Sequence, residues 1–184
     1  MDNEILKNIY TRRSVRDYQD KPVEKEIIEK LLNCAVMAPS AMNKQPWHFT
    51  IVEGKEHIKH FGEAALKQFN LLNLSVKWGF KLTRWESIFY NAPLLIILSG
   101  KKNAHFIKDD TNLAVQNMFL AAHSLGLGSC WIGFALPLDK NENARKELGI
   151  PDNFEIVAPL IFGYPKKVND KIPKREPKIL KWIS

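Results

Sequence analysis

Residues 109–133 read DDTNLAVQNMFLAAHSLGLGSCWIG and carry the strongest fold signal in the chain. The first part, Asp109 to Leu125, predicts a helix, with acidic residues in its first turn and Gly126 just after its end. Its apolar residues surround most of the helix: Leu113, Ala114, Val115, Met118, Phe119, Leu120, Ala121, Ala122 and Leu125. We therefore expect this helix to be buried on nearly all sides.

Helical and extended patterns alternate on both sides of this stretch. Apolar residues at helical spacing predict helices near Ile5 to Ile9, over Val23 to Met37, over Lys55 to Phe69 and near Asn141 to Leu148. Apolar runs predict strands over Trp47 to Glu53, Leu94 to Ser99, Ser129 to Phe134 and Glu155 to Phe162. The order has no regular βαβ units, so we expect an α+β fold in three layers. Residues 70–90 follow no clean period and stay unassigned.

Length and composition indicate one globular domain over residues 1–184. Of the 184 residues, 45% are hydrophobic and 26% are charged, a balance that excludes a disordered chain. The longest purely apolar run, Leu94 to Leu98, is far too short to span a bilayer. The first residues contain Asp2 and Glu4 and no apolar core, so no signal peptide is expected. The chain has two cysteines and no CxxC pair, which favours a cytoplasmic location.

The formal net charge of +7 leaves two interpretations open. The excess lies in Arg12-Arg13-Ser14-Val15-Arg16 and in the tail from Lys166 to Lys181. Two basic segments can converge on one small phosphate or follow a nucleic-acid backbone. Taken alone, the first segment is equally typical of a solvated charge run at a helix end.

Four segments together resemble the FMN-dependent nitroreductase family. They are Arg12 to Arg16, Ala38 to Trp47 (APSAMNKQPW), Gly126 to Gly133 (GLGSCWIG), and Gly163-Tyr164-Pro165 followed by Pro173-Lys174-Arg175. The resemblance implies the nitroreductase-like α+β fold, a central, mainly antiparallel sheet flanked by helices, in an intertwined homodimer. It also implies that helix 109–125 lies at the dimer core and that two FMN sites lie at the interface.

The resemblance assigns the basic residues to the phosphate end of FMN. A phosphate is a dianion near neutral pH, and arginine offers a planar fork of donors that matches it. The implied phosphate and ribityl contacts are Arg12, Arg13, Ser14, Arg16, Lys174 and Arg175. Cationic groups near the flavin would also tune its reduction potential.

Two further segments are implied contacts of the flavin ring. The first comprises Pro39, Ser40, Ala41, Met42, Asn43 and Gln45, which would reach the flavin held mainly by the partner subunit. The second comprises Cys130, Trp131, Ile132 and Gly133, with the Ile132 N–H facing flavin N5. This segment lacks GxGxxG spacing and follows a helix, so it is no dinucleotide fingerprint.

No histidine or acid lies near Cys130 in sequence, which favours a buried apolar thiol over a nucleophile.

The implied activity is ping-pong transfer of electrons from NADH or NADPH, through FMN, to nitroaromatics, quinones or similar flat acceptors. Other reactions on the same scaffold remain open: ene-reduction, dehalogenation, flavin fragmentation, or flavin binding without turnover. The aromatic residues of segment 70–90 would contribute to the core, the dimer contact or substrate choice. A basic nucleic-acid-binding module is the remote alternative. The histidines show no HExxH or other ligand spacing, so no metal site is expected.

Overall fold

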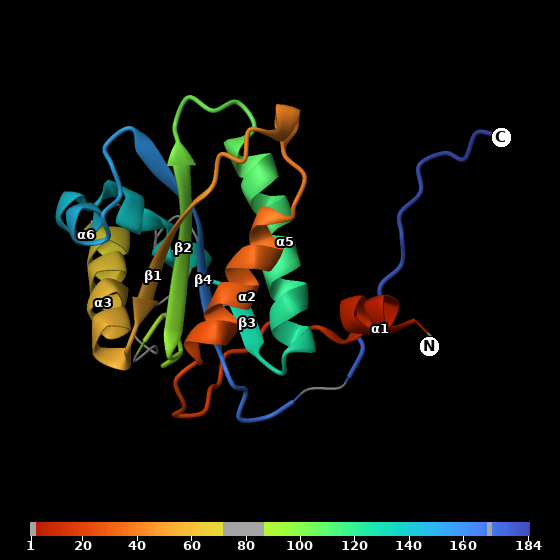
Figure 1. The fold of residues 1–184 in the computed structure, drawn as a ribbon, viewed down its shortest axis with the longest axis horizontal. Helices are drawn as coiled ribbons and strands as arrows, with labels where there is room; N and C mark the ends of the chain where they lie inside the picture. The colour runs from red at the N-terminus through yellow and green to blue at the C-terminus, as the bar shows by residue number, and fades with distance from the viewer. Residues whose placement is uncertain (1–2, 72–86, 169–170) are drawn as a thin grey trace.

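The computed structural model describes residues 3–71, 87–168 and 171–184. Its sheet has the strand order β1-β2-β4-β3, and every neighbouring pair is antiparallel. The strands are β1 (His48–Glu53), β2 (Leu94–Lys101), β3 (Gly128–Trp131) and β4 (Phe154–Gly163). Helices lie on both faces of the sheet (Figure 1), so the α+β nitroreductase-like fold is confirmed.

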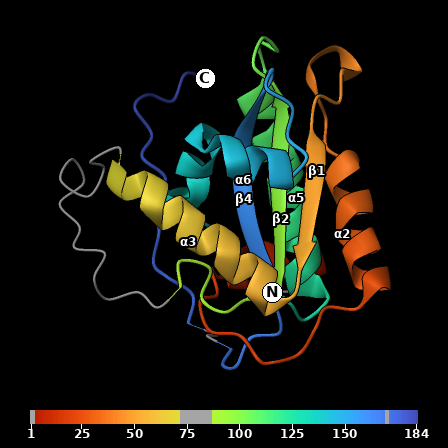
Figure 2. The same cartoon turned by 90° about the vertical axis from the view of Figure 1, so that its left-hand side faces the viewer.

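Each face of the sheet has its own pair of helices. α2 (Lys25–Val36) and α5 (Ile107–Ser124) cover one face, while α3 (Lys55–Leu71) and α6 (Glu142–Glu147) lie on the other, as Figure 2 shows from the side. α1 (Glu4–Thr11) stands outside these layers beside the C-terminal end of α5. None of the helices in the described ranges has both the length and the apolarity needed to cross a membrane.

β2 is the centre of the core because its side chains are buried on both faces. Leu95 and Ile97 pack into the cluster on the α3 side, whereas Leu94, Ile96 and Leu98 pack into the cluster on the α2 and α5 side. A strand covered on both faces carries a continuous apolar run instead of an alternating one. This explains why residues 94–98 contain no polar side chain.

The predicted strand over Ser129 to Phe134 is too long, because β3 ends at Trp131. The register pairs Trp131 with Leu160, and the next residue, Ile132, donates its N–H to the carbonyl of Pro159 at 2.9 Å. Pro159 has no N–H to return the second bond of the pair. The Ile132 carbonyl instead accepts from Ala135 at 3.0 Å, and the 3₁₀ helix η3 (Gly133–Lys140) follows.

The expectation that helix 109–125 is buried on nearly all sides is not met within one chain. The helix starts two residues earlier, at Ile107, and its Leu113 side chain is 46% exposed. Of the aromatic residues in segment 70–90, Phe89 is fully buried, whereas residues 72–86 lie outside the described residues.

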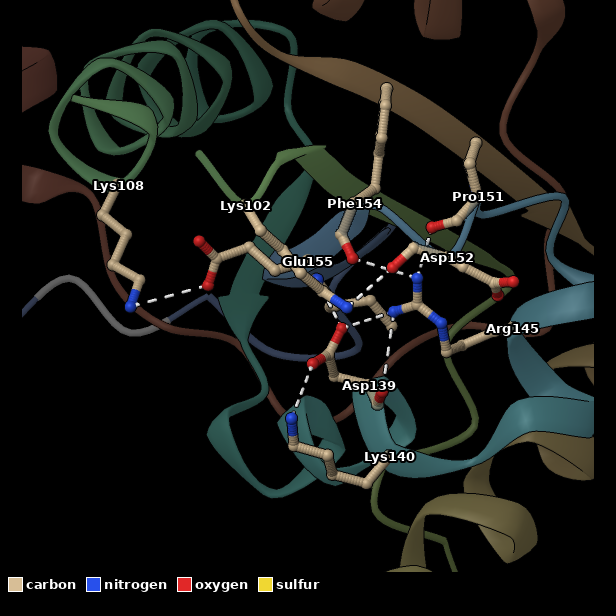
Figure 3. A network of polar contacts seen from close by, with 10 residues as sticks. Lys102, Lys108, Asp139, Lys140, Arg145, Pro151, Asp152, Phe154 and Glu155 are labelled. Carbon is tan, nitrogen blue, oxygen red and sulfur yellow. Dashed lines mark hydrogen bonds and ion pairs between the residues drawn. The ribbon is translucent and has the colours of Figure 1, made fainter. Parts of the chain in front are cut away.

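An ion pair between the buried Arg145 and the partly buried Asp139 fixes η3 and α6 to the start of β4 (Figure 3). Arg145 Nη1 donates to Asp139 Oδ1 at 2.6 Å, and its Nη2 donates to the carbonyls of Pro151 and Phe154. Asp139 Oδ1 also accepts the Ile156 N–H at 2.9 Å. The carboxylate thus joins three segments that are separate in the sequence, and the Arg145 residue is only 6% exposed.

Candidate functional site

A cavity of about 380 Å³, here called the basic cleft, lies at the C-terminal end of α5. Three segments form it: the residues after α1, the turn between α5 and β3, and the residues after β4. Backbone bonds hold them together, because Val15 N–H donates to Ser129 at 3.0 Å and Lys166 N–H donates to Asp17 at 3.1 Å. Its lining comprises Thr11 to Asp17, His123, Gly126 to Ser129, Pro165, Lys167 and Val168.

Gly128 is the residue that lets the basic segment lie against β3. A Cβ at this position would lie 2.6 to 2.8 Å from three side-chain carbons of Val15. Ordinary carbon contacts are about 3.5–4.0 Å, so only glycine fits here without moving the neighbouring segment. The close approach places Ser14 in a parallel bridge with Ser129 along the edge strand.

The cleft concentrates positive charge that its own carboxylate does not balance. Arg12 is half-buried, and its pKa is lowered first by desolvation and then by repulsion from Arg13 and Arg175. The Arg12 guanidinium carbon lies 5.7 Å from the centre of the Phe119 ring. The nearby carboxylate of Asp17 pairs instead with Lys166, at 3.2 Å. An anion entering the cleft would relieve this repulsion.

The residues that were predicted to contact the phosphate differ in where their side chains lie. Ser14 and Arg16 line the cleft, and the Arg16 guanidinium carbon lies 6.0 Å from the Tyr90 ring centre. Arg13 Nε and Nη2 each donate to the Lys171 carbonyl at 3.0 Å, so this side chain fastens the C-terminal segment.

The two tail residues that were predicted to contact the phosphate, Lys174 and Arg175, have different surroundings. Arg175 approaches Arg12 closely enough to lower its pKa. Lys174 Nζ pairs with Glu176 at 3.1 Å and is absent from the described lining of the cleft. Lys167, and not Lys174, is the lysine of the basic tail that lines the cleft among the described residues.

Cys130 is 2% exposed, as expected for a buried thiol. Burial raises its pKa, against the opposing effects of Arg16, a Ser14 hydrogen bond and Arg12. The thiol donates weakly to the Trp131 carbonyl, at 3.5 Å. A protonated, buried thiol of this kind is not an activated nucleophile.

A second hollow, of about 520 Å³, lies farther along β3 and is here called the apolar groove. Trp131 and Gly133 line it together with Lys108, Asn112, Leu136, Pro137, Asp139, Lys140, Glu155, Ile156 and Val157. Space is open beside Gly133, since a Cβ there would meet no heavy atom within 4 Å. The Ile132 N–H donates to the Pro159 carbonyl in this structure, whereas the family resemblance implied that it faces flavin N5.

β3 connects the two hollows. Gly128 and Ser129 line the basic cleft, and Trp131 lines the apolar groove. Three residues of strand span about 10 Å. The edge strand thus runs from a strongly cationic cavity to a largely apolar one.

The predicted ring-contacting loop, residues 38–46, is strained and held at its base. Met42, Asn43 and Gln45 have positive φ values of 52°, 53° and 46°, which cost non-glycine residues about 1–2 kcal/mol each. Gln45 Nε2 donates to Asn43 Oδ1 at 3.0 Å, and the buried Asp110 accepts the Ala41 N–H at 3.0 Å. This arrangement leaves the Met42 side chain 80% exposed, and such strain is typical of functional loops.

The loop and the basic cleft lie at opposite ends of α5 (Figure 1). Asp110, in the first turn of the helix, anchors the loop, and His123, in its last turn, lines the cleft. Thirteen residues of helix span about 20 Å. One chain therefore does not bring Pro39, Ser40, Ala41, Met42, Asn43 and Gln45 to its own Arg12 to Arg16 segment.

Thr11 and His123 line the cleft although the sequence did not single them out, whereas Lys167 belongs to the basic tail that was noted. Thr11 Oγ1 and His123 Nε2 are 2.8 Å apart. The one sequence signal for His123 is its place in the last helical turn before Gly126. That position favours a cation but does not identify a ligand-binding residue.

The Nitroreductase family model matches residues 9–164, which include the Arg12 to Arg16 segment, the 38–46 loop and β3. An Archaeoglobus fulgidus protein with the provisional name NADH dehydrogenase/NAD(P)H nitroreductase is 36% identical over 171 residues. The match covers 91% of this chain and 88% of that protein. The iodotyrosine deiodinase of Thermotoga neapolitana is 32% identical over 177 residues, covering 90% of each chain.

Among solved structures, the nitroreductase of Bacteroides fragilis with bound FMN has a TM-score of 0.83 and 29% identity. The match covers 99% of this chain and 98% of that one. Sequence and structure comparisons thus agree along nearly the whole chain. The chain belongs to the nitroreductase family.

Proposed function

We propose that this protein is an FMN-dependent oxidoreductase that takes electrons from NADH or NADPH and reduces a flat acceptor such as a nitroaromatic or a quinone. The observation that carries the proposal is the path of β3 from the basic cleft to the apolar groove. FMN has the matching chemistry, with a phosphate at one end and a flat ring system at the other. Several relatives support this, including the FMN-bound B. fragilis structure.

The basic cleft fits a phosphate. Desolvation, and then repulsion from Arg13 and Arg175, lowers the pKa of Arg12. A dianion placed among these three cations would be stabilised by attraction to all of them and would relieve their mutual repulsion. Arg12 and Arg16 offer planar donor forks, and Ser14 offers a hydroxyl. The close Gly128–Val15 contact holds this segment in position before the ligand arrives.

The apolar groove fits the ring end. The bare backbone of Gly133 lets a flat ring approach closely, and the half-buried Trp131 offers an aromatic surface. FMN, when bound, supplies the two-electron redox chemistry. The protein then needs only to bind and orient the nicotinamide donor and the acceptor and to exclude water from the flavin. We assign no residue of the chain as a general acid or base.

We further propose that the site is completed by a second copy of the chain. The loop at Met42 lies about 20 Å along α5 from the cleft of the same chain. In a dimer with two-fold symmetry, the loop of one subunit would instead reach the site of the other subunit. Exposed apolar side chains need cover: Leu113 at 46%, Leu180 at 104% and Trp182 at 81%. The tail that carries Leu180 and Trp182 extends away from the body of the chain (Figure 1).

The first test is the visible spectrum of the purified protein, followed by anaerobic addition of NADH and then of NADPH. We expect flavin absorption that bleaches with one or both donors and returns when a quinone or nitroaromatic is added. Flavin that resists both donors would favour binding without turnover. A colourless protein that takes up no added FMN would refute the proposal, and a salt-sensitive complex with DNA would then favour the nucleic-acid alternative.

Sedimentation of the full chain and of a variant ending at Lys178 tests the assembly. We expect a dimer for the full chain and weaker association for the variant, because it loses Ile179, Leu180, Trp182 and Ile183. A full-length protein that is monomeric in sedimentation and still binds FMN would refute the shared site.

We also propose a cytoplasmic location, since both described cysteines are free thiols and a reducing compartment keeps them so.

Reductive dehalogenation is the second candidate function, because the T. neapolitana deiodinase is 32% identical over nearly the whole chain. This reaction replaces a carbon–iodine bond with a carbon–hydrogen bond, using two electrons and one proton and releasing iodide. Anaerobic mixing of the reduced protein with iodotyrosine distinguishes the two candidates. Stoichiometric iodide release would favour dehalogenation, whereas reoxidation by quinone without iodide release would favour the reductase.

A further inference from the structure

We propose that His123 is a proton-linked part of the basic cleft, which takes up a proton at Nδ1 when a phosphate monoester dianion enters. The imidazolium then adds a cation to those of the arginines. This inference rests on the proposed function, in which the cleft holds the phosphate of FMN. It adds a residue that senses whether the phosphate is present.

The Thr11 hydroxyl determines which nitrogen of His123 titrates. Thr11 Oγ1 donates its single hydrogen to the Lys7 carbonyl at 2.7 Å. Toward His123 Nε2, at 2.8 Å, the same oxygen can therefore only accept. Nε2 carries a hydrogen in both protonation states, and Nδ1 is the atom that gains or loses the proton. Among the described residues, Nδ1 has no hydrogen-bond partner.

The charges around His123 come from every segment packed against it. α1 contributes Glu4 and Lys7, which pair with each other at 3.6 Å. The segment after α1 contributes Arg12, Arg13 and Asp17, and the segment after β4 contributes Lys167. Asp17 is paired with Lys166. The last turn of α5 adds the partial negative charge of the helix C-terminus, which favours a cation at His123.

These groups keep the imidazole neutral when the cleft is empty. Desolvation, then repulsion from Arg12 and from Arg13, lowers the pKa of His123 from its usual value near 6.5. At pH 7 the ring is therefore neutral. A phosphate dianion in the cleft brings two negative charges close to the ring and screens it from both arginines, so the pKa rises. Protons are taken up at any pH between the values of the free and the bound protein.

Calorimetry at pH 7.0, in buffers of different ionisation enthalpy, measures this uptake directly. FMN would be titrated into apoprotein, with riboflavin as the matched ligand that lacks the phosphate. We expect FMN binding to take up close to one proton per site and riboflavin binding to take up almost none. The FMN phosphate itself, with a second pKa of about 6, would contribute only a small part at this pH.

Two variants assign the proton. His123→Gln should abolish most of the uptake and weaken FMN binding roughly threefold to tenfold at pH 7.0, with less effect on riboflavin. His57→Gln is the matched control, because His57 lies on α3, on the other face of the sheet, and should leave both measurements unchanged. Nitrogen NMR shifts of His123 provide a second readout: an Nε2–H ring in apoprotein and an imidazolium with FMN.

The possible outcomes separate the two proposals. No FMN binding by the wild-type protein would overturn the proposed function and this inference with it. Normal FMN binding without proton uptake, or with the same uptake in His123→Gln, would overturn this inference and leave the proposed function intact. An apoprotein ring protonated at Nδ1 at pH 7.0 would also overturn it.

Discussion

Replacing Gly128 with alanine tests how the close packing of β3 positions the basic cleft. The new methyl group would lie 2.6 to 2.8 Å from the Cβ, Cγ1 and Cγ2 atoms of Val15, so the two segments must separate by about 1 Å. The Val15–Ser129 hydrogen bond, now 3.0 Å, would lengthen beyond hydrogen-bonding distance. Overpacking costs about 1–3 kcal/mol and the lost bond about 1 kcal/mol. We expect the free energy of unfolding to fall by roughly 2–4 kcal/mol.

FMN affinity should fall for the same reason. Moving Arg12 and Arg16 by about 1 Å breaks charge-assisted hydrogen bonds to a phosphate, each worth roughly 1.5–3 kcal/mol. The loss of one such bond weakens binding by about 10- to 100-fold. Urea unfolding measures the first effect, and FMN titration of the apoprotein measures the second.

Two companion variants make this experiment decisive. Gly133→Ala meets no heavy atom within 4 Å, so its stability should stay within about 0.5 kcal/mol of wild type. Adding Val15→Gly to Gly128→Ala removes all three clashing carbons and should restore part of the FMN affinity. A Gly128→Ala protein with wild-type stability and affinity would refute the packing argument. Lost stability with unchanged affinity would refute the link between this contact and the cleft.

Three further changes test the surrounding structure. Asp139→Ala leaves the buried Arg145 guanidinium unpaired, so the free energy of unfolding should fall by about 3–5 kcal/mol, measured by urea denaturation. Tyr164→Phe should raise the pKa of Glu24, which the Tyr164 hydroxyl, at 2.5 Å, holds at about 2. The stabilisation from Glu24 is present above its usual pKa of 4.5 and is lost as the pH falls toward 2, and NMR titration of this carboxyl would report any change. Asn141→Ala removes the cap of α6 and should cost about 1 kcal/mol by thermal unfolding, whereas an unchanged midpoint would show that the cap contributes nothing.

Local signals were sufficient for most helices and strands. The apolar run of β2 and the acidic start and glycine end of α5 are encoded within each segment, so the predicted bounds agree with the structure to within two residues. β3 was predicted too long because its end depends on Pro159, which lies in another strand. A single-sequence pattern does not reveal which residue faces Ile132 across the ladder.

The candidate site was predicted less completely than the fold. The Arg12 to Arg16 segment and β3 were identified, and the structure brings them together at Ser14 and Ser129. The family resemblance assigned Lys174 to the phosphate, whereas in the structure its side chain pairs with Glu176. His123 was not singled out because its contact with Thr11 joins residues 112 positions apart in the chain.

The sequence by itself determined the elements and the chemistry available to them, because apolar period, helix caps and side-chain charge are local properties. It also showed that the chain has a basic segment, a basic tail and a glycine-rich turn. Only the tertiary structure decided where they meet: Gly128 against Val15, His123 beside Thr11, and the 38–46 loop at the far end of α5 from the cleft. The physical reason is that such contacts join residues far apart in the chain. Their distances follow from how helices and strands pack around one core, which no local pattern specifies.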